Sequence, residues 1–233
     1  MFKINIKEYL KILELFASNK SNSTSQCFQD LFVLYFSKFK SDGYFVDIGA
    51  SNGVTFSNSF ILERKGWKGI VSEPENTWHK KLNQRNCIKD YRAIYDQSDL
   101  DVSFSHVEND PMLSGITEHF AEDGNQKFRK NFVTKKYKTV SLNDLLIEHK
   151  APKEIDYISI DTEGSESKIL KSFNFDNFKV QIFTIEHNFV KEKKENVAKI
   201  MKENGYIGIF DHISKHDDWF LKRDNEVLKN ISI

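Results

Sequence analysis

Acidic residues and glycines follow several short apolar runs of this 233-residue chain. The first group is Asp47-Ile48-Gly49-Ala50-Ser51-Asn52-Gly53. Gly49 and Gly53 allow a tight turn and a close approach of backbone to ligand, in a G-x-x-x-G spacing rather than the G-x-G-x-x-G of dinucleotide folds. A carboxylate at Asp47 would repel a pyrophosphate and attract an ammonium group. The loop therefore predicts a ligand with an amino-acid moiety, the alternative being a tight turn without a ligand.

Two further acids suggest that this ligand also contains a nucleoside. Glu73 ends the next apolar run, twenty positions after Gly53. Nucleoside-binding folds place an acid at about this distance to accept hydrogen bonds from ribose hydroxyls. Asp96 follows the third run and could read an adenine amino group. The alternatives are an acid that favours a helix start at Glu73 and a turn-forming aspartate at Asp96.

Two later groups of polar residues suggest the chemistry. They are Asp161-Thr162-Glu163-Gly164-Ser165-Glu166 and Glu186-His187-Asn188. Such a cluster of carboxylates repels itself unless a cation, a donor or a proton occupies it. If the two preceding strands are neighbours, the groups offer a general base or a divalent metal site held by Asp161, Glu186 and His187. His187 could also be a buried, hydrogen-bonded histidine.

The elements that must position these residues alternate between strand and helix. Apolar runs predict strands at 44–48, 67–72, 88–95, 155–160 and 180–185, and closing strands at 206–210 and 219–221. An edge strand or hairpin arm is expected at 102–107, and a further strand at 137–140. Helices are expected at 55–65, 74–85, 165–173 and 191–204. Alternation of this kind predicts an α/β fold with a mostly parallel sheet and helices on both faces. Ligands bind beyond the carboxyl ends of such strands, where all the acidic groups fall.

The remaining segments flank or interrupt this core. Residues 1–40 are predicted to form a helical extension packed on a main domain of residues 41–233. Residues 108–136 are polar and irregular, and we expect a substrate-side insertion at about 106–138. Ser141 and Asp144 resemble the start of a helix, with Ser141 as its N-cap.

Composition excludes several classes of protein. Lys and Arg together number 34, as do Asp and Glu, so the zero net charge argues against a nucleic-acid-binding protein. A local basic strip runs from Lys127 to Lys138, either as a solvated loop or edge strand or as a contact for an anionic substrate. Two cysteines without zinc spacing predict a reduced, cytoplasmic setting. No signal peptide or membrane span is expected.

Taken in order, these motifs resemble the FkbM family of S-adenosylmethionine-dependent O-methyltransferases, within class I of the methyltransferases. The resemblance spans residues 26–210. It is carried by Gln29-Asp30-Leu31-Phe32, the loop from Phe45 to Gly53, Ser57-Asn58, Leu62-Glu63, Gly66-Trp67-Lys68-Gly69, Glu73-Pro74, Thr139 to Leu146, Ile155 to Glu166 and Ile185-Glu186-His187.

The resemblance implies a Rossmann-like sheet of seven strands with the last strand antiparallel. It also implies S-adenosylmethionine as cofactor, with contacts from Asp47, Gly49, Asn52, Ser57, Asn58 and Glu73. We expect the cofactor site to include Gln29, Ala50, Gly53, Asp96 and Asp161 as well. Residues 41–233 would then be the methyltransferase domain.

The expected reaction is methyl transfer to a hydroxyl of a small molecule, most simply a sugar of a surface polysaccharide or its nucleotide-activated precursor. A hydroxyl is a poor nucleophile, so His187, Asp161 or Glu163 would act as base, or Mg²⁺ or Mn²⁺ would acidify it. A homo-oligomer is possible. The competing hypotheses are a non-catalytic binding module of the same fold and a nucleotide-linked oxidoreductase.

Overall fold

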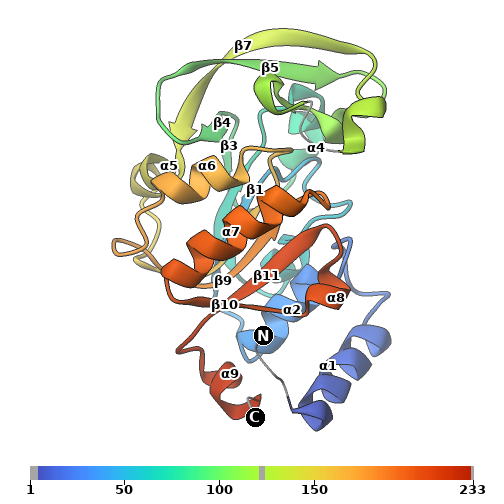
Figure 1. Cartoon of the computed structure of the whole chain (residues 1–233), viewed down its shortest axis with the longest axis vertical. Helices are drawn as coiled ribbons and strands as arrows, with labels where there is room; N and C mark the ends of the chain where they lie inside the picture. Colours follow the sequence, from blue (N-terminus) through green and yellow to red (C-terminus); the bar gives the residue numbers. More distant parts are fainter. Residues whose placement is uncertain (1–4, 121–123, 232–233) are drawn as a thin grey trace.

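One seven-stranded sheet forms the centre of the computed structural model, which describes residues 5–120 and 124–231 (Figure 1). The strand order is β10-β11-β9-β8-β1-β2-β3. The strands are β1 (Tyr44–Ile48), β2 (Lys68–Ser72), β3 (Ile88–Asp90), β8 (Glu154–Ile160), β9 (Lys179–Glu186), β10 (Tyr206–Ile209) and β11 (Asp217–Lys222).

Strand β1 lies inside this sheet and pairs in parallel with both β2 and β8. Strand β9 continues the parallel series beside β8. Only β11 reverses direction, because it is antiparallel to both β9 and β10. The predicted seven-stranded, mostly parallel sheet with an antiparallel last strand is confirmed.

Helices cover both faces of the sheet, as predicted. Because side chains alternate along a strand, Phe45 faces one layer and Val46 the other. Phe45 belongs to a core with α1 (Ile6–Ser18), α2 (Gln29–Phe36), α3 (Phe60–Arg64) and α4 (His79–Leu82). Val46 belongs to a core with α5 (Leu142–Glu148), α6 (Glu166–Ser172) and α7 (Lys191–Glu203). The short helices α8 (Asp211–Ser214) and α9 (Glu226–Ile231) follow β10 and β11.

The N-terminal helices pack on the first of these cores. Ile12 and Phe16 of α1 are buried there, and Phe32 of α2 lies 4.7 Å from the ring of Trp219. The division at residue 40 into an extension and a main domain remains a prediction. None of the helices in the described part of the chain has the length and apolar character that a membrane-spanning segment needs.

A second, smaller sheet has the order β4-β7-β5-β6. It contains β4 (Ala93–Tyr95), β5 (Asp101–Val107), β6 (Gly115–Ile116) and β7 (Phe132–Ser141). Figure 1 places β5 and β7 at the end of the molecule opposite α1 and α9. Four short 3₁₀ helices are described, η1 (Asn76–Trp78), η2 (Pro111–Leu113), η3 (Thr117–His119) and η4 (Gly124–Lys127).

Two predicted boundaries are wrong in this region. The run 88–95 is not one strand, because the chain turns after Asp90, whose carboxylate accepts from the Arg92 N–H at 3.0 Å. Its two halves, β3 and β4, join different sheets. Residues 132–136, expected to be irregular, are strand because they pair with β5. That pairing is tertiary and leaves no local signal in a polar segment.

The helix expected at 55–65 is shorter than predicted, since α3 begins at Phe60. The side chain of Asn52 accepts hydrogen bonds from the N–H groups of Val54 and Thr55 at 2.9 and 2.8 Å, and Phe56 has a positive φ of 58°. A side-chain turn of this kind competes with helix formation. The predicted N-cap at Ser141 is confirmed, because its side chain accepts from the Asp144 N–H.

Candidate active site

A cavity of about 730 Å³ lies at the carboxyl ends of β1, β2, β8 and β9. Its opposite wall comes from the second sheet and from residues 110–114. Small-molecule pockets typically measure ~300–1,000 Å³, so a cofactor-sized ligand fits. The predicted residues that line the cavity are Gln29, Asp47, Gly49, Ala50, Ser57, Asn58, Glu73, Asp161, Glu163 and Glu186.

Four predicted site residues do not line it: Asn52, Gly53, Asp96 and His187. Asn52 instead forms the side-chain turn described above. Asp96 has a buried carboxylate oxygen without a hydrogen-bond partner among the described residues. His187 is buried, with its Nδ1 accepting from the Phe189 N–H at 3.1 Å. Burial, and then the charge of Lys194, lower the pKa of His187.

The glycine loop is shaped by packing as well as by space for a ligand. Gly49 has a φ of 81°, and a Cβ atom there would lie 1.6 Å from the carbonyl oxygen of Asp161. The end of β8 therefore touches the loop directly. Gly53 has a φ of 76°, and a Cβ there would meet Leu82 at 2.7 Å. The sequence predicted that the Gly49 backbone approaches a ligand closely. In the structure this backbone lies close to that of Asp161.

Asp47 is buried beneath this loop and held in one orientation. Its carboxylate accepts a hydrogen bond of 2.5 Å from the Ser59 hydroxyl. Ser59 accepts in turn from Arg85 at 3.1 Å. Burial raises the pKa of Asp47, while the Ser59 hydrogen bond and the charge of Arg85 oppose that rise. The site thus carries a fixed, desolvated acid beside the loop.

Asn58 offers an acceptor in the cavity wall. Its Nδ2 donates to the Ser159 hydroxyl at 2.9 Å, whereas its Oδ1 is buried and has no hydrogen-bond partner within residues 5–120 and 124–231. A buried polar atom left in this way costs about 1–3 kcal/mol. A ligand donor such as an ammonium group would remove that cost.

Glu73 directly follows β2, and both of its carboxylate oxygens accept hydrogen bonds. Oε2 accepts from the Ser51 N–H and Oε1 from the Glu75 N–H, each at 2.7 Å. Each oxygen still has a lone pair for a further donor. Burial raises the pKa of Glu73 to about 7, against the two backbone hydrogen bonds.

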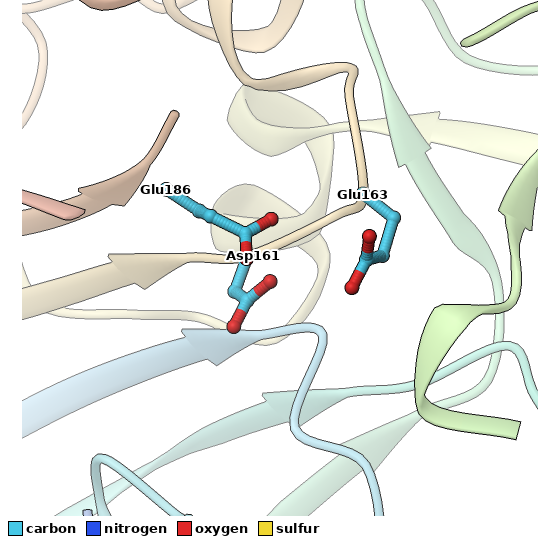
Figure 2. Close-up of side chains that lie close together, drawn as sticks. All are labelled: Asp161, Glu163 and Glu186. Carbon is cyan, nitrogen blue, oxygen red and sulfur yellow. The ribbon is translucent and has the colours of Figure 1, made fainter. Parts of the chain in front are cut away.

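Three carboxylates converge where β8 and β9 end (Figure 2). Asp161, Glu163 and Glu186 each bring an oxygen within 4.8 Å of the others. Burial, and then the charge of Asp217, raise the pKa of Asp161 to about 8. Burial and the charge of Asp161 raise the pKa of Glu186 well above its ordinary value. Glu186 Oε2 is buried without a hydrogen-bond partner among the described residues.

Glu163 differs from its two neighbours because a cation reaches it from the loop between η4 and β7. Arg129 donates to Glu163 Oε2 at 2.6 Å, and the Arg129 side chain is only 1% exposed. Arg129 belongs to the basic strip that the sequence left open between a solvated loop and a substrate contact. In the structure it is neither, whereas Lys127 lines the cavity.

Asp217 is a polar neighbour that the sequence analysis did not identify. It accepts from Gln29 Nε2 at 2.5 Å and pairs in register with Glu186, at the start of β11. Burial raises the pKa of Asp217 to about 7. An antiparallel last strand begins at the edge where the parallel strands end. The predicted antiparallel last strand, together with the adjacent acids Asp217 and Asp218, was the sequence signal that could have identified this residue.

The charge of the cavity wall fits a cationic ligand. Six of the described lining residues carry carboxylates, and Lys127 is the sole lysine or arginine among them. S-adenosylmethionine has a sulfonium and an ammonium group, and donors on its ribose. The buried acids and the unpartnered Asn58 oxygen therefore suit it.

Fold and site together define an S-adenosylmethionine-dependent methyltransferase with a Rossmann-like α/β sheet. More narrowly, residues 47–207 match the model of the methyltransferase FkbM domain, and the chain belongs to that family. No curated protein sequence matches the chain.

Two solved structures resemble the chain at low identity. One is the precorrin-6y C5,15-methyltransferase of Geobacter metallireducens, with 10% identity, a TM-score of 0.42 and coverage of 82% of this chain and 85% of that one. The other is M. capricolum TrmK in complex with S-adenosyl-homocysteine, with 11% identity, a TM-score of 0.39 and coverage of 83% and 68%.

Proposed function

We propose that the protein methylates a hydroxyl oxygen of a small molecule, namely a sugar of a surface polysaccharide or its nucleotide-activated precursor. The observation that carries this proposal is the convergence of Asp161, Glu163 and Glu186 in the cavity that also holds the cofactor loop. A hydroxyl must lose its proton as its oxygen gains a methyl group, and carboxylates can receive that proton. The sugar class rests on the family.

The cofactor, when bound, supplies a methyl carbon whose bond to sulfur breaks as the bond to the acceptor oxygen forms, leaving a neutral thioether. Gln29, Asp47 and Asn58 would hold its amino-acid part, beside Gly49, Ala50 and Ser57. Glu73 would accept from the ribose hydroxyls. The sequence also proposed Asn52, Gly53 and Asp96 as contacts, and their positions outside the cavity lining do not support that role.

The proton of the acceptor hydroxyl passes, in this proposal, to Asp161, with Glu163 beside it. His187 was a third hypothesis for the base, but it does not line the cavity. Lys127 lines the cavity and would pair with a phosphate of an activated sugar.

The test uses radiolabelled S-adenosylmethionine and a panel of nucleotide sugars and polysaccharide fragments. We expect an alkali-stable methyl ether on one sugar, and a fall of about 10²–10⁴-fold in the rate for Asp161→Asn. Binding of S-adenosylhomocysteine by that variant should stay within a few-fold of wild type. Transfer to nitrogen or carbon acceptors alone would contradict the proposal.

A divalent cation is the second route to an activated hydroxyl. The sequence proposed Asp161, Glu186 and His187 as its ligands. In the structure Glu163, rather than His187, brings its oxygen within 4.8 Å of Asp161 and Glu186. An all-oxygen set suits Mg²⁺ or Mn²⁺. We therefore propose the three carboxylates as the ligands, tested by activity in excess chelator and after Mn²⁺ is restored. Undiminished turnover in excess chelator would contradict a metal site and leave Asp161 as the base that accepts the proton.

A further inference from the structure

A buried pair joins the second sheet to the cofactor side of the cavity. His106 lies on β5 and Glu75 follows β2, with His106 Nδ1 2.6 Å from Glu75 Oε2. Glu75 is 2% exposed and His106 is 8% exposed. Burial raises the pKa of Glu75, but hydrogen bonds from Thr77 and His106 outweigh it and hold the pKa below its ordinary value. An ionised carboxylate only accepts, so Nδ1 carries the hydrogen and donates it.

Glu75 connects this pair to Glu73. The backbone N–H of Glu75 donates to Glu73 Oε1 at 2.7 Å. The Glu75 side chain also accepts from the N–H and the hydroxyl of Thr77, at 3.0 and 2.7 Å. Three donors therefore fix the Glu75 carboxylate, and its own N–H fixes one oxygen of Glu73. His106 is the donor among them that comes from the second sheet.

Packing alone does not explain a histidine at position 106. Its ring lies 5.2 Å from the ring of Phe104 and 5.5 Å from that of Tyr137, where a phenylalanine would also pack. Its other nitrogen, Nε2, is buried with no hydrogen-bond partner among the described residues. An unsatisfied buried nitrogen costs about 1–3 kcal/mol. Because Nε2 carries this cost, the favourable contribution of a histidine at this position lies in the hydrogen bond that Nδ1 donates to Glu75.

We propose that His106 is a positioning residue for the cofactor ribose. By holding Glu75, it aims the Glu75 N–H at Glu73 and so keeps the Glu73 carboxylate turned toward the ribose hydroxyls. His106 itself does not line the cavity. Through His106, the second sheet thereby affects cofactor affinity in addition to lining part of the cavity. This inference rests on the proposed role of Glu73.

The experiment measures binding of S-adenosylhomocysteine by titration calorimetry, which needs no acceptor. His106→Phe keeps the aromatic packing and removes the donor, and we expect affinity to fall about tenfold, as for the loss of one hydrogen bond to a charged group. His106→Asn places an amide nitrogen near the position of Nδ1 and should recover most of the affinity. Thermal unfolding checks that both variants fold.

A second ligand isolates the ribose contact. The 2′,3′-dideoxy analogue of S-adenosylhomocysteine lacks the hydroxyls that Glu73 would accept, so wild type and His106→Phe should bind it equally. A matched control is Lys168→Met, which breaks the bond of 2.5 Å between α6 and Glu118 of η3, away from the cavity lining. This variant should bind S-adenosylhomocysteine as wild type does.

Two outcomes would overturn the inference. One is unchanged affinity of a folded His106→Phe protein for S-adenosylhomocysteine. The other is an equal loss for the dideoxy analogue, which would make the effect a general disturbance of the cavity. Because no acceptor is used, failure to find a sugar substrate would leave both results valid. A Glu73→Gln protein with unchanged affinity would instead refute the ribose role of Glu73, and with it the inference.

Discussion

The Arg129 guanidinium donates a hydrogen bond of 2.6 Å to Glu163, although the two residues are 34 positions apart. The same guanidinium donates to the carbonyl oxygens of Leu113 and Phe120, each at 3.1 Å. One buried cation thus joins the loop after β8 to two segments that connect strands of the second sheet. The position of Glu163 depends on these connecting segments for this reason.

Replacing Arg129 with methionine should therefore destabilise the protein strongly. It leaves Glu163 buried beside other acids without this cation, and breaking a buried pair in this way costs about 3–5 kcal/mol. Chemical denaturation measures the change. The double variant Arg129→Met, Glu163→Gln should regain much of the loss because the charge that Arg129 had balanced is gone. Equal stability of the single and double variants would show that the charge of Glu163 is not the cause.

Cofactor affinity should increase with pH because of Glu73. Its pKa is raised to about 7, and the ionised form is the better acceptor for ribose hydroxyls. The dissociation constant of S-adenosylhomocysteine should fall as the pH rises through 7, and calorimetry between pH 6 and 8 measures this. Glu73→Gln should bind more weakly at high pH and lose that dependence.

The raised pKa of Glu73 makes the stability of the cofactor-free protein decrease as the pH rises, whereas cofactor affinity increases. The folded pKa of Glu73 lies above its ordinary value of 4.5, so the folded state holds a proton that the unfolded state has lost between pH 4.5 and about 7. The contribution of Glu73 to stability is present below this window and is lost as the pH rises through it. Denaturation of wild type and Glu73→Gln across that range should reveal the difference.

Gly49 and Gly205 offer a matched pair of glycine substitutions. Both have positive φ, 81° and 83°, but a Cβ at Gly49 would lie 1.6 Å from the Asp161 carbonyl oxygen, whereas nothing lies within 4 Å at Gly205. Gly205→Ala should cost only the backbone strain of about 1–2 kcal/mol. Gly49→Ala should cost clearly more and abolish binding of S-adenosylhomocysteine. Similar melting temperatures for the two would contradict the close contact.

Lys127 should matter for an acceptor that carries phosphate, because it lines the cavity. Lys127→Gln is expected to raise KM for a nucleotide-activated sugar about tenfold, with little change in kcat, as for one lost charge-assisted hydrogen bond. Lys135→Gln, which changes an exposed lysine of β7 outside the cavity lining, is the control. An equal effect of both variants would indicate long-range electrostatics instead.

The sheet and the strand-end acids were predictable because both are local signals. Apolar runs predicted the strands; Asp47 lies near the end of one, and Glu73 and Asp161 directly follow two others. The second sheet was predictable only in part: 102–107 and 137–140 carried strand signals, but residues 132–136 of β7 are polar and are strand only through tertiary pairing with β5. The partners of the acids were hidden for a similar reason: Arg129, Asp217 and His106 come from segments distant in sequence.

The direction of β11 has a consequence for how the protein is made. Strand β11 enters the sheet between β9 and β10 and brings Asp217 against Glu186, yet it lies beyond the end of the family match at residue 207. Until the ribosome has released this segment, β9 is an unpaired edge on that side. A nascent chain that has completed every parallel strand therefore still lacks the strand that covers β9 and places Asp217 beside Glu186.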